Sequence, residues 1–160
     1  MRIGVMSDSH GRMPAVEQAL AVLLEKGVQT VIHCGDIDDA STVRLFAGWD
    51  AHFVLGNCDN DRDVLKDAID EINATLHEPY GSLGLEGRKI GFVHGHIDFL
   101  MREMKRSGTF DFLFYGHTHK PDDYQFGPTR VINPGALHRA IPKTFISLDL
   151  ATGEIERMAL

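Results

Sequence analysis

The chain has 160 residues with 23 acidic and 16 basic side chains, so its formal charge is −7 with the histidines neutral. Apolar residues make up 43% and charged residues 24%, which is typical of a globular protein and excludes a disordered or low-complexity chain. The acidic balance argues against a protein that coats nucleic acid, because binding to the phosphate backbone needs a basic face. We expect one domain spanning residues 1–160.

Cysteine usage and hydropathy favour a cytoplasmic protein. Two cysteines, Cys34 and Cys58, are too few for a disulfide framework, which points to a reducing compartment. The apolar run over residues 3–6 is too short for a signal peptide, and no run approaches the ~18 residues of a membrane span. We therefore expect no membrane partner.

The first part of the chain alternates strand and helix signals. A buried strand is predicted over 3–6, followed by a helix over 13–26 that Pro14 opens and Gly27 ends. Strands over 30–34 and 51–55 flank a helix over 40–48, and 61–70 is a weaker helical or loop segment. This β-α-β-α-β order predicts a parallel sheet wrapped by helices.

The second part is richer in strands. A helix is predicted over 98–106 and a strongly apolar strand over 110–115. The other predicted strands lie at 74–77, 81–86, 89–93, 123–126, 129–132, 143–149 and 154–158. The whole pattern indicates an α/β fold without an internal repeat or a linker.

Five predicted strands end directly before a polar cluster. The clusters are Asp8-Ser9-His10, Gly35-Asp36, Gly56-Asn57-Cys58-Asp59, His94-Gly95-His96 and Gly116-His117-Thr118-His119. Ligands of open α/β sheets bind beyond the carboxyl ends of the strands, so these clusters can converge. Their oxygen and imidazole donors suit Mn, Fe, Co, Ni or Zn rather than calcium. Seven of these side chains are candidate ligands: Asp8, His10, Asp36, Asn57, His94, His117 and His119. Seven exceed the four ligands of one tetrahedral ion, whereas two ions sharing a carboxylate would use them all.

Each position alone also has a structural explanation. Asp8 could cap a turn, and Asp36 and Asn57 could serve as turn residues after glycine. Those explanations do not account for their common place after strands. Four further histidines have no motif around them and are assigned to structure or surface: His33, His52, His77 and His138.

In this order the motifs resemble those of the calcineurin-like metallophosphoesterases. The turn Ile132-Asn133-Pro134-Gly135 resembles one in the small cap-less bacterial and archaeal phosphodiesterases of that group. The resemblance implies a four-layer α/β/β/α sandwich as a single metallophosphoesterase domain. It also implies that the turn's backbone buttresses the loop of His117 and His119.

The resemblance further implies a binuclear metal site. Asp8, His10 and His119 would hold one divalent ion, Asn57, His94 and His117 would hold the other, and Asp36 would bridge both. Manganese is the first choice, with Fe, Co, Ni or Zn as alternatives. The implied reaction is attack on a phosphoester by a hydroxide that bridges the two ions.

One position departs from the commoner family pattern. Many members carry a histidine after the motif asparagine, near the leaving-group oxygen, where this chain has Cys58. The small phosphodiesterase subgroup resembles this chain in reading Gly-Asn-Cys-Asp, but the expected general acid is still missing. Catalysis would then favour substrates with good leaving groups, or another residue would donate the proton, with His96 the nearest candidate in the sequence. Asp59 is expected to orient a ligand or to cap the next segment rather than to contact metal.

The favoured function is a metal-dependent phosphodiesterase. The preference for diesters rests on the resemblance to the small cap-less subgroup and on chain length, since no insertion is long enough to form a cap domain that would select a small substrate. A phosphomonoesterase or nucleotide phosphatase on the same scaffold, a non-catalytic retromer-type scaffold, and a purely structural metal site remain alternatives. The expected partner is a phosphoester small molecule or a nucleotide, without stable nucleic-acid binding. A homo-oligomer is left open.

Overall fold

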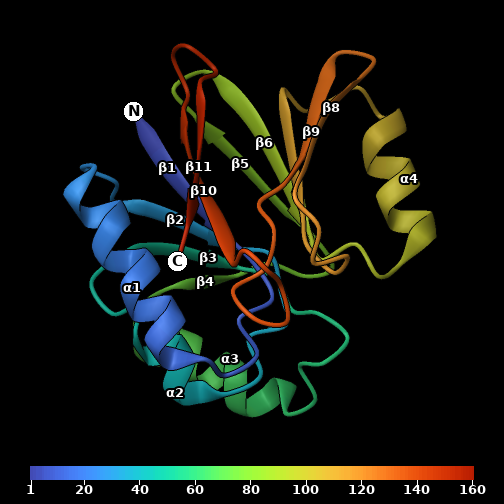
Figure 1. Ribbon diagram of the computed structural model, residues 1–160. Helices are drawn as coiled ribbons and strands as arrows, with labels where there is room; N and C mark the ends of the chain where they lie inside the picture. Colours follow the sequence, from blue (N-terminus) through green and yellow to red (C-terminus); the bar gives the residue numbers. More distant parts are fainter.

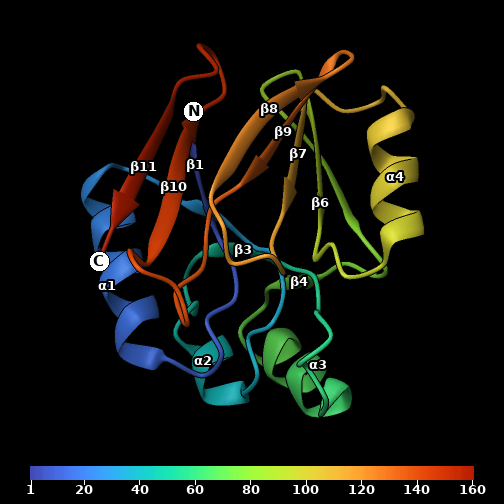
Figure 2. The same cartoon turned by 45° about the vertical axis from the view of Figure 1, so that its right-hand side comes forward.

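The computed structural model describes residues 1–160, and its strands form two sheets that face each other (Figure 1, Figure 2). In the six-stranded sheet the order is β11 (Ile155–Ala159), β10 (Thr144–Asp149), β1 (Arg2–Met6), β2 (Thr30–His33), β3 (Asp50–Phe53) and β4 (Thr75–Leu76). Strands β1 to β4 run parallel, and β10 pairs antiparallel with β1 and with β11.

The five-stranded sheet also has a parallel centre. Its order is β5 (Gly81–Leu85), β6 (Arg88–Val93), β7 (Phe112–Tyr115), β9 (Thr129–Asn133) and β8 (Asp122–Phe126). Strands β6, β7 and β9 are parallel, whereas the edge strands β5 and β8 are antiparallel to their neighbours.

Helices cover the outer faces of both sheets (Figure 1). Three of them, α1 (Met13–Glu25), α2 (Ala40–Arg44) and α3 (Arg62–Glu71), pack on the six-stranded sheet, and α4 (Asp98–Arg106) packs on the five-stranded sheet. The expected four-layer α/β/β/α sandwich is confirmed. None of these helices combines the length and the apolar character needed to cross a bilayer.

Three apolar clusters fill the spaces between the layers. Nineteen buried residues lie between the six-stranded sheet and its helices, thirteen lie between the sheets, and six lie under α4. Successive side chains along each strand point to opposite faces of the sheet, so Val31 faces the helices while Ile32 faces the other sheet. In β7, Phe112 and Phe114 point between the sheets and Leu113 points toward α4.

Two predicted elements are shorter than expected. Helix α2 ends at Arg44 rather than at residue 48, because the chain continues in tight turns whose N–H groups bond three residues back, until Gly48 adopts a φ of 86°. Strand β7 begins at Phe112 rather than at residue 110. The remaining predicted strands and helices match the structure within two residues at each end.

The parallel strands place the polar clusters at one edge of the sandwich. Met6 pairs with His33, and His33 pairs with Phe53, so β1, β2 and β3 end level with one another. Val93 pairs with Tyr115 at the corresponding ends of β6 and β7 in the second sheet. The loops that follow these strands therefore meet in one place.

Candidate metal centre

Four of the predicted ligands form a compact cluster. Single ligand atoms of Asp8, His10, Asp36 and His119 all lie within 4.8 Å of one another. His119 Nε2 is 3.2 Å from Asp8 Oδ1, and His10 Nε2 is 3.4 Å from His119 Nε2 and 3.7 Å from Asp36 Oδ2. Residues more than a hundred positions apart thus direct their donor atoms at one small volume.

The chemistry of this cluster fits a bound cation. Asp8 is fully buried, and its Oδ1 forms no hydrogen bond, although His119 Nε2 lies 3.2 Å from it. A buried carboxylate oxygen without a partner is costly unless a cation satisfies it. His10 and His119 likewise face each other through Nε2 atoms, at least one of which presents a lone pair.

The other predicted ligands converge beside the first cluster. His94 Nε2 lies 3.1 Å from Asn57 Oδ1 and 3.4 Å from Asp36 Oδ2, and the His94 ring is 5.2 Å from the ring of His117. His94 Nδ1 lies 2.8 Å from the carbonyl oxygen of Cys34. We assign a proton to Nδ1, which donates to this carbonyl, so that Nε2 can release its own proton and offer its lone pair when a cation binds.

Asp36 belongs to both groups. The same oxygen, Oδ2, approaches His10 on one side and His94 on the other. Burial alone would raise the pKa of Asp36, but the hydrogen bond and charge of His94 outweigh it, so the pKa lies well below its usual value. The same pairing raises the pKa of His94 against the opposing effect of burial.

Burial changes from the floor of the site to its rim. Asp8, Asp36 and His94 are buried, and His10 and His119 are half-buried. Asn57 and His117 are exposed. The two groups therefore form a partly open centre whose carboxylates lie at the bottom.

The backbone around these residues is strained in a common way. Five of the seven predicted ligands have left-handed φ values: Asp8, His10, Asp36, His117 and His119. Such conformations in residues other than glycine cluster at functional sites, where the surrounding structure holds them. Gly56 allows a close approach, because a Cβ there would lie 2.8 Å from His94 Nε2 and would overlap Asp36 Oδ1.

Comparison with known proteins identifies the family. Residues 1–153 match the calcineurin-like phosphoesterase superfamily domain. The chain belongs to this superfamily. It is 33% identical over 138 residues to Phosphodiesterase MJ0936 of Methanocaldococcus jannaschii, covering 84% of this chain and 83% of the relative. It is 29% identical over 158 residues to Phosphodiesterase YfcE of Escherichia coli K12, covering 89% of this chain and 82% of the relative.

Solved structures agree with this assignment. A novel archaeal phosphodiesterase superposes with a TM-score of 0.92 at 30% identity, covering 100% of both chains. Vps29 of Entamoeba histolytica, solved with Zn²⁺, has a TM-score of 0.68 at 21% identity over 100% of this chain and 98% of that chain, which shows the fold alone. Family membership, the phosphodiesterase relatives and the Asp/His cluster together make the chain a divalent-metal-dependent phosphoesterase.

Two residues support the loops of this phosphoesterase centre. The buried carboxylate of Asp59 accepts backbone N–H groups from four residues at 2.7 to 2.9 Å: Asp36, Ile37, Asp38 and Gly56. Asn133 Nδ2 donates to the carbonyl of Gly116 and to Thr118 Oγ1. The side chain of Asn133, rather than the backbone of its turn, therefore braces the loop that carries His117 and His119.

Cys58 and His96 lie on the open side of the phosphoesterase centre. The Cys58 backbone N–H donates to Asp36 Oδ1 at 2.9 Å, and burial followed by the charge of Asp36 raises the pKa of the thiol to about 11. The exposed His96 ring is 5.3 Å from that of His94 and 6.2 Å from that of His117. Burial, and then the two neighbouring histidines, lower the pKa of His96.

Sequence reasoning missed two features beside His10. Asp38 Oδ2 lies 3.2 Å from His10 Nδ1 and orients the ring, a contact that no spacing in the sequence signals. The His138 ring lies 5.7 Å from that of His10. Burial, followed by the charges of nearby cations, lowers the pKa of His138.

Proposed function

We propose that this phosphoesterase hydrolyses phosphodiesters at a centre that holds two divalent metal ions. The observation that carries the proposal is the position of Asp36 Oδ2, which lies 3.7 Å from His10 Nε2 and 3.4 Å from His94 Nε2. A single carboxylate oxygen between two sets of donors is the arrangement that a shared ligand requires.

The proposal divides the seven ligands as follows. Asp8, His10 and His119 hold one ion, Asn57, His94 and His117 hold the other, and Asp36 contacts both. Manganese is the favoured ion, because carboxylate, amide and imidazole donors without a thiolate suit it; Fe, Co, Ni and Zn share that preference in part. All seven residues come from one chain, so the proposed site is complete without a homo-oligomer.

Bound ions at such a centre activate water near neutral pH and stabilise the charge of the transferring phosphate. The protein's own groups fix the geometry. Asp59 holds the backbone on either side of Asp36, and the carbonyl of Cys34 keeps the Nε2 lone pair of His94 directed inward. His96 is placed to give a proton to the leaving-group oxygen, because its exposed ring adjoins His94 and His117 at the rim.

Two observations support a diester substrate over a monoester. Both curated relatives quoted above are named phosphodiesterases, and MJ0936 is 33% identical to this chain. The rim of the centre is exposed at Asn57 and His117, and the four helices cover the outer faces of the sheets instead of the site. A phosphate with two substituents can therefore enter.

The proposal also includes the class of substrate and the cellular compartment. The substrate is a small phosphoester or a nucleotide rather than a nucleic acid, because the chain carries a net charge of −7. We place the protein in the cytoplasm, since Cys34 and Cys58 are both free thiols.

The decisive experiment compares bis(4-nitrophenyl) phosphate with 4-nitrophenyl phosphate as substrates of protein stripped of metal by a chelator, before and after Mn²⁺ is added. We expect hydrolysis that requires Mn²⁺ and prefers the diester. Asp36→Asn should lower kcat/KM by at least about 10³-fold, because several kcal/mol of transition-state stabilisation depend on the ions.

Asn57→Ala should cost less, since Asn57 is assigned to one ion only. Retained turnover in Asp36→Asn would falsify the two-ion assignment. Tight metal binding without turnover of either ester would instead favour the scaffold function.

A further inference from the structure

A basic hollow lies beside the metal centre. It is an open depression of about 450 Å³ lined by Arg12, His138, Arg139, Ala140, Ile141 and Lys143. No acidic side chain lines it. The hollow adjoins the predicted ligands directly, because the ring of His138 lies 5.7 Å from the ring of His10.

The cations of the basic hollow have no partners within the protein. Several other surface arginines pair with carboxylates, as Arg44 does with Glu71 and Arg130 with Asp123. Arg12, Arg139 and Lys143 form no ion pair and no side-chain hydrogen bond. In a chain with a net charge of −7, three unpaired cations gathered in one depression are a concentration of positive potential.

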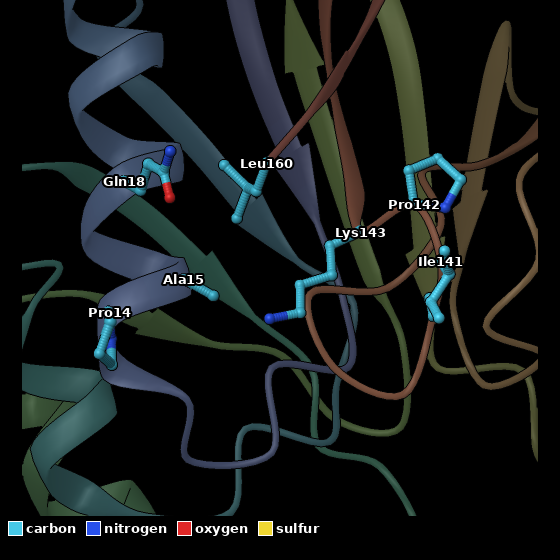
Figure 3. Close-up of a pocket in the computed structure, with 8 residues that line it drawn as sticks. Pro14, Ala15, Gln18, Ile141, Pro142, Lys143 and Leu160 are labelled. Carbon is cyan, nitrogen blue, oxygen red and sulfur yellow. The ribbon is translucent and has the colours of Figure 1, made fainter.

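The basic hollow continues toward helix α1. Lys143, Ala140 and Ile141 also line a second depression of about 350 Å³ against Pro14, Ala15 and Gln18. Figure 3 shows the Lys143 side chain extending from its loop toward Ala15, with Ile141 and Pro142 on the far side of the loop. The two depressions share Lys143, so the basic hollow extends from His138 toward α1.

We propose that the basic hollow binds a second phosphate group of the substrate while the first phosphate occupies the metal centre. This inference rests on the proposed function, since it describes the substrate of the same site. Guanidinium groups bind phosphate oxygens through paired, charge-assisted hydrogen bonds, and Arg12 and Arg139 supply two such groups. Lys143 adds a third charge from the side of α1.

The substrate class follows from this placement. A phosphodiester with uncharged substituents would leave the three cations without a partner, whereas a nucleotide that carries a further phosphate would engage them. That further phosphate can be a terminal monoester or a second diester within the same small nucleotide. Both groups present the anionic phosphate oxygens that the hollow would bind. A terminal monoester differs from a diester in its greater negative charge and in having one substituent fewer.

The test compares inhibitors of bis(4-nitrophenyl) phosphate hydrolysis by the Mn²⁺-loaded protein. Thymidine 5′-monophosphate offers one phosphate, and thymidine 3′,5′-bisphosphate offers two. A third inhibitor, the bisphosphate with its 3′-phosphate methylated, presents the second phosphate as a diester. Calorimetry measures the same three affinities without turnover.

We expect the bisphosphate to bind at least about tenfold more tightly than the monophosphate. Arg12→Gln and Arg139→Gln should each reduce this preference about threefold, and the double variant should nearly abolish it. Rising salt should weaken the preference as well. Lys89→Gln is the matched control, because Lys89 is exposed at the opposite end of β6 and also lacks a side-chain partner.

The outcomes separate the inference from the proposed function. Equal affinity for the monophosphate and both bisphosphates, or an equal loss of preference in Lys89→Gln, overturns the role of the basic hollow. Absence of Mn²⁺-dependent hydrolysis overturns the proposed function, and calorimetry then decides the hollow alone. If the methylated inhibitor binds as tightly as the bisphosphate, the hollow accepts an internal diester. If methylation removes the tight binding, the hollow requires a terminal phosphate.

Discussion

At the scale of single residues, the proposed general acid is His96. This ring lies at the rim beside the rings of His94 and His117. General acid catalysis matters most when the leaving group is a poor one. We expect His96→Gln to lower kcat about 10²-fold on an alkyl phosphodiester and far less on bis(4-nitrophenyl) phosphate. Equal losses on the two substrates would exclude His96 as the acid.

Asp59 is expected to act through the loop of Asp36 and not by touching the substrate. Its carboxylate accepts four backbone N–H groups, and Asn in its place would turn an NH₂ group toward some of them. Asp59→Asn should weaken metal binding about 10- to 100-fold and lower the free energy of unfolding by about 1–3 kcal/mol.

A metal titration and urea unfolding measure these two effects separately. Asp61→Asn serves as the control, because the Asp61 side chain does not cap helix α3. A variant that is less stable but binds metal with unchanged affinity would show that Asp59 has only a structural role.

At this scale the sequence predicts the convergence of the candidate ligands better than the contacts that surround them. Asp8, Asp36 and His94 follow strands whose ends are readable from hydrophobic patterning, so their convergence could be anticipated. The contact of Asp38 with His10 joins residues 28 positions apart through two loops. Its existence depends on the left-handed conformation at both residues, which local sequence does not specify.

At the scale of elements, the loop after β7 depends on close contact with the end of β1. A Cβ at Gly116 would lie 2.6 Å from Asp8 Oδ2 and would also overlap Ser7 Oγ. Gly116→Ala should therefore shift the loop of His117 and His119 and lower metal affinity and kcat/KM by at least about tenfold, as displaced metal supports do. Gly84→Ala in β5 is the matched control, because a Cβ there meets nothing within 4 Å.

Crystal structures or chemical shifts of the two variants would locate the change. If Gly116→Ala binds metal like the parent protein, the close packing of this loop against Ser7 and Asp8 is not required.

Most element boundaries were predictable, whereas the pairing of the strands was not. Hydrophobic runs ending in glycine mark β2, β3, β6 and β7. The local pattern of residues 144–149 does not indicate that β10 lies antiparallel beside β1. This pairing joins positions nearly 150 residues apart. Periodicity reports which face of a strand is buried, and it carries no information on the neighbouring strand.

At the scale of the whole molecule, folding keeps one histidine neutral. His33 at the end of β2 is 1% exposed, and its ring packs against Phe46 and Phe53. Its Nδ1 accepts the N–H of Gly35, so Nε2 carries the proton that faces Ser9 Oγ. Burial, followed by the charge of His94, lowers the pKa of His33 to about 3.

This depressed pKa makes the stability of the fold sensitive to acid. Between pH 6.5 and about 3 the unfolded chain binds a proton at His33 and the folded chain does not, so the free energy of unfolding falls as the pH falls. From pH 6.5 to 5 the loss from this residue alone is about 2 kcal/mol, at about 1.4 kcal/mol per pH unit.

Urea unfolding of metal-free protein across this range measures the slope, with His33→Asn as the comparison. The variant should be less stable at neutral pH, but the pH dependence of its free energy of unfolding should be shallower by about one proton, since His33 is the only group that differs between the two proteins. Equal slopes would show that His33 is not held neutral by folding. The slope difference is independent of the absolute stability that the substitution costs, so a weakened core does not obscure the result.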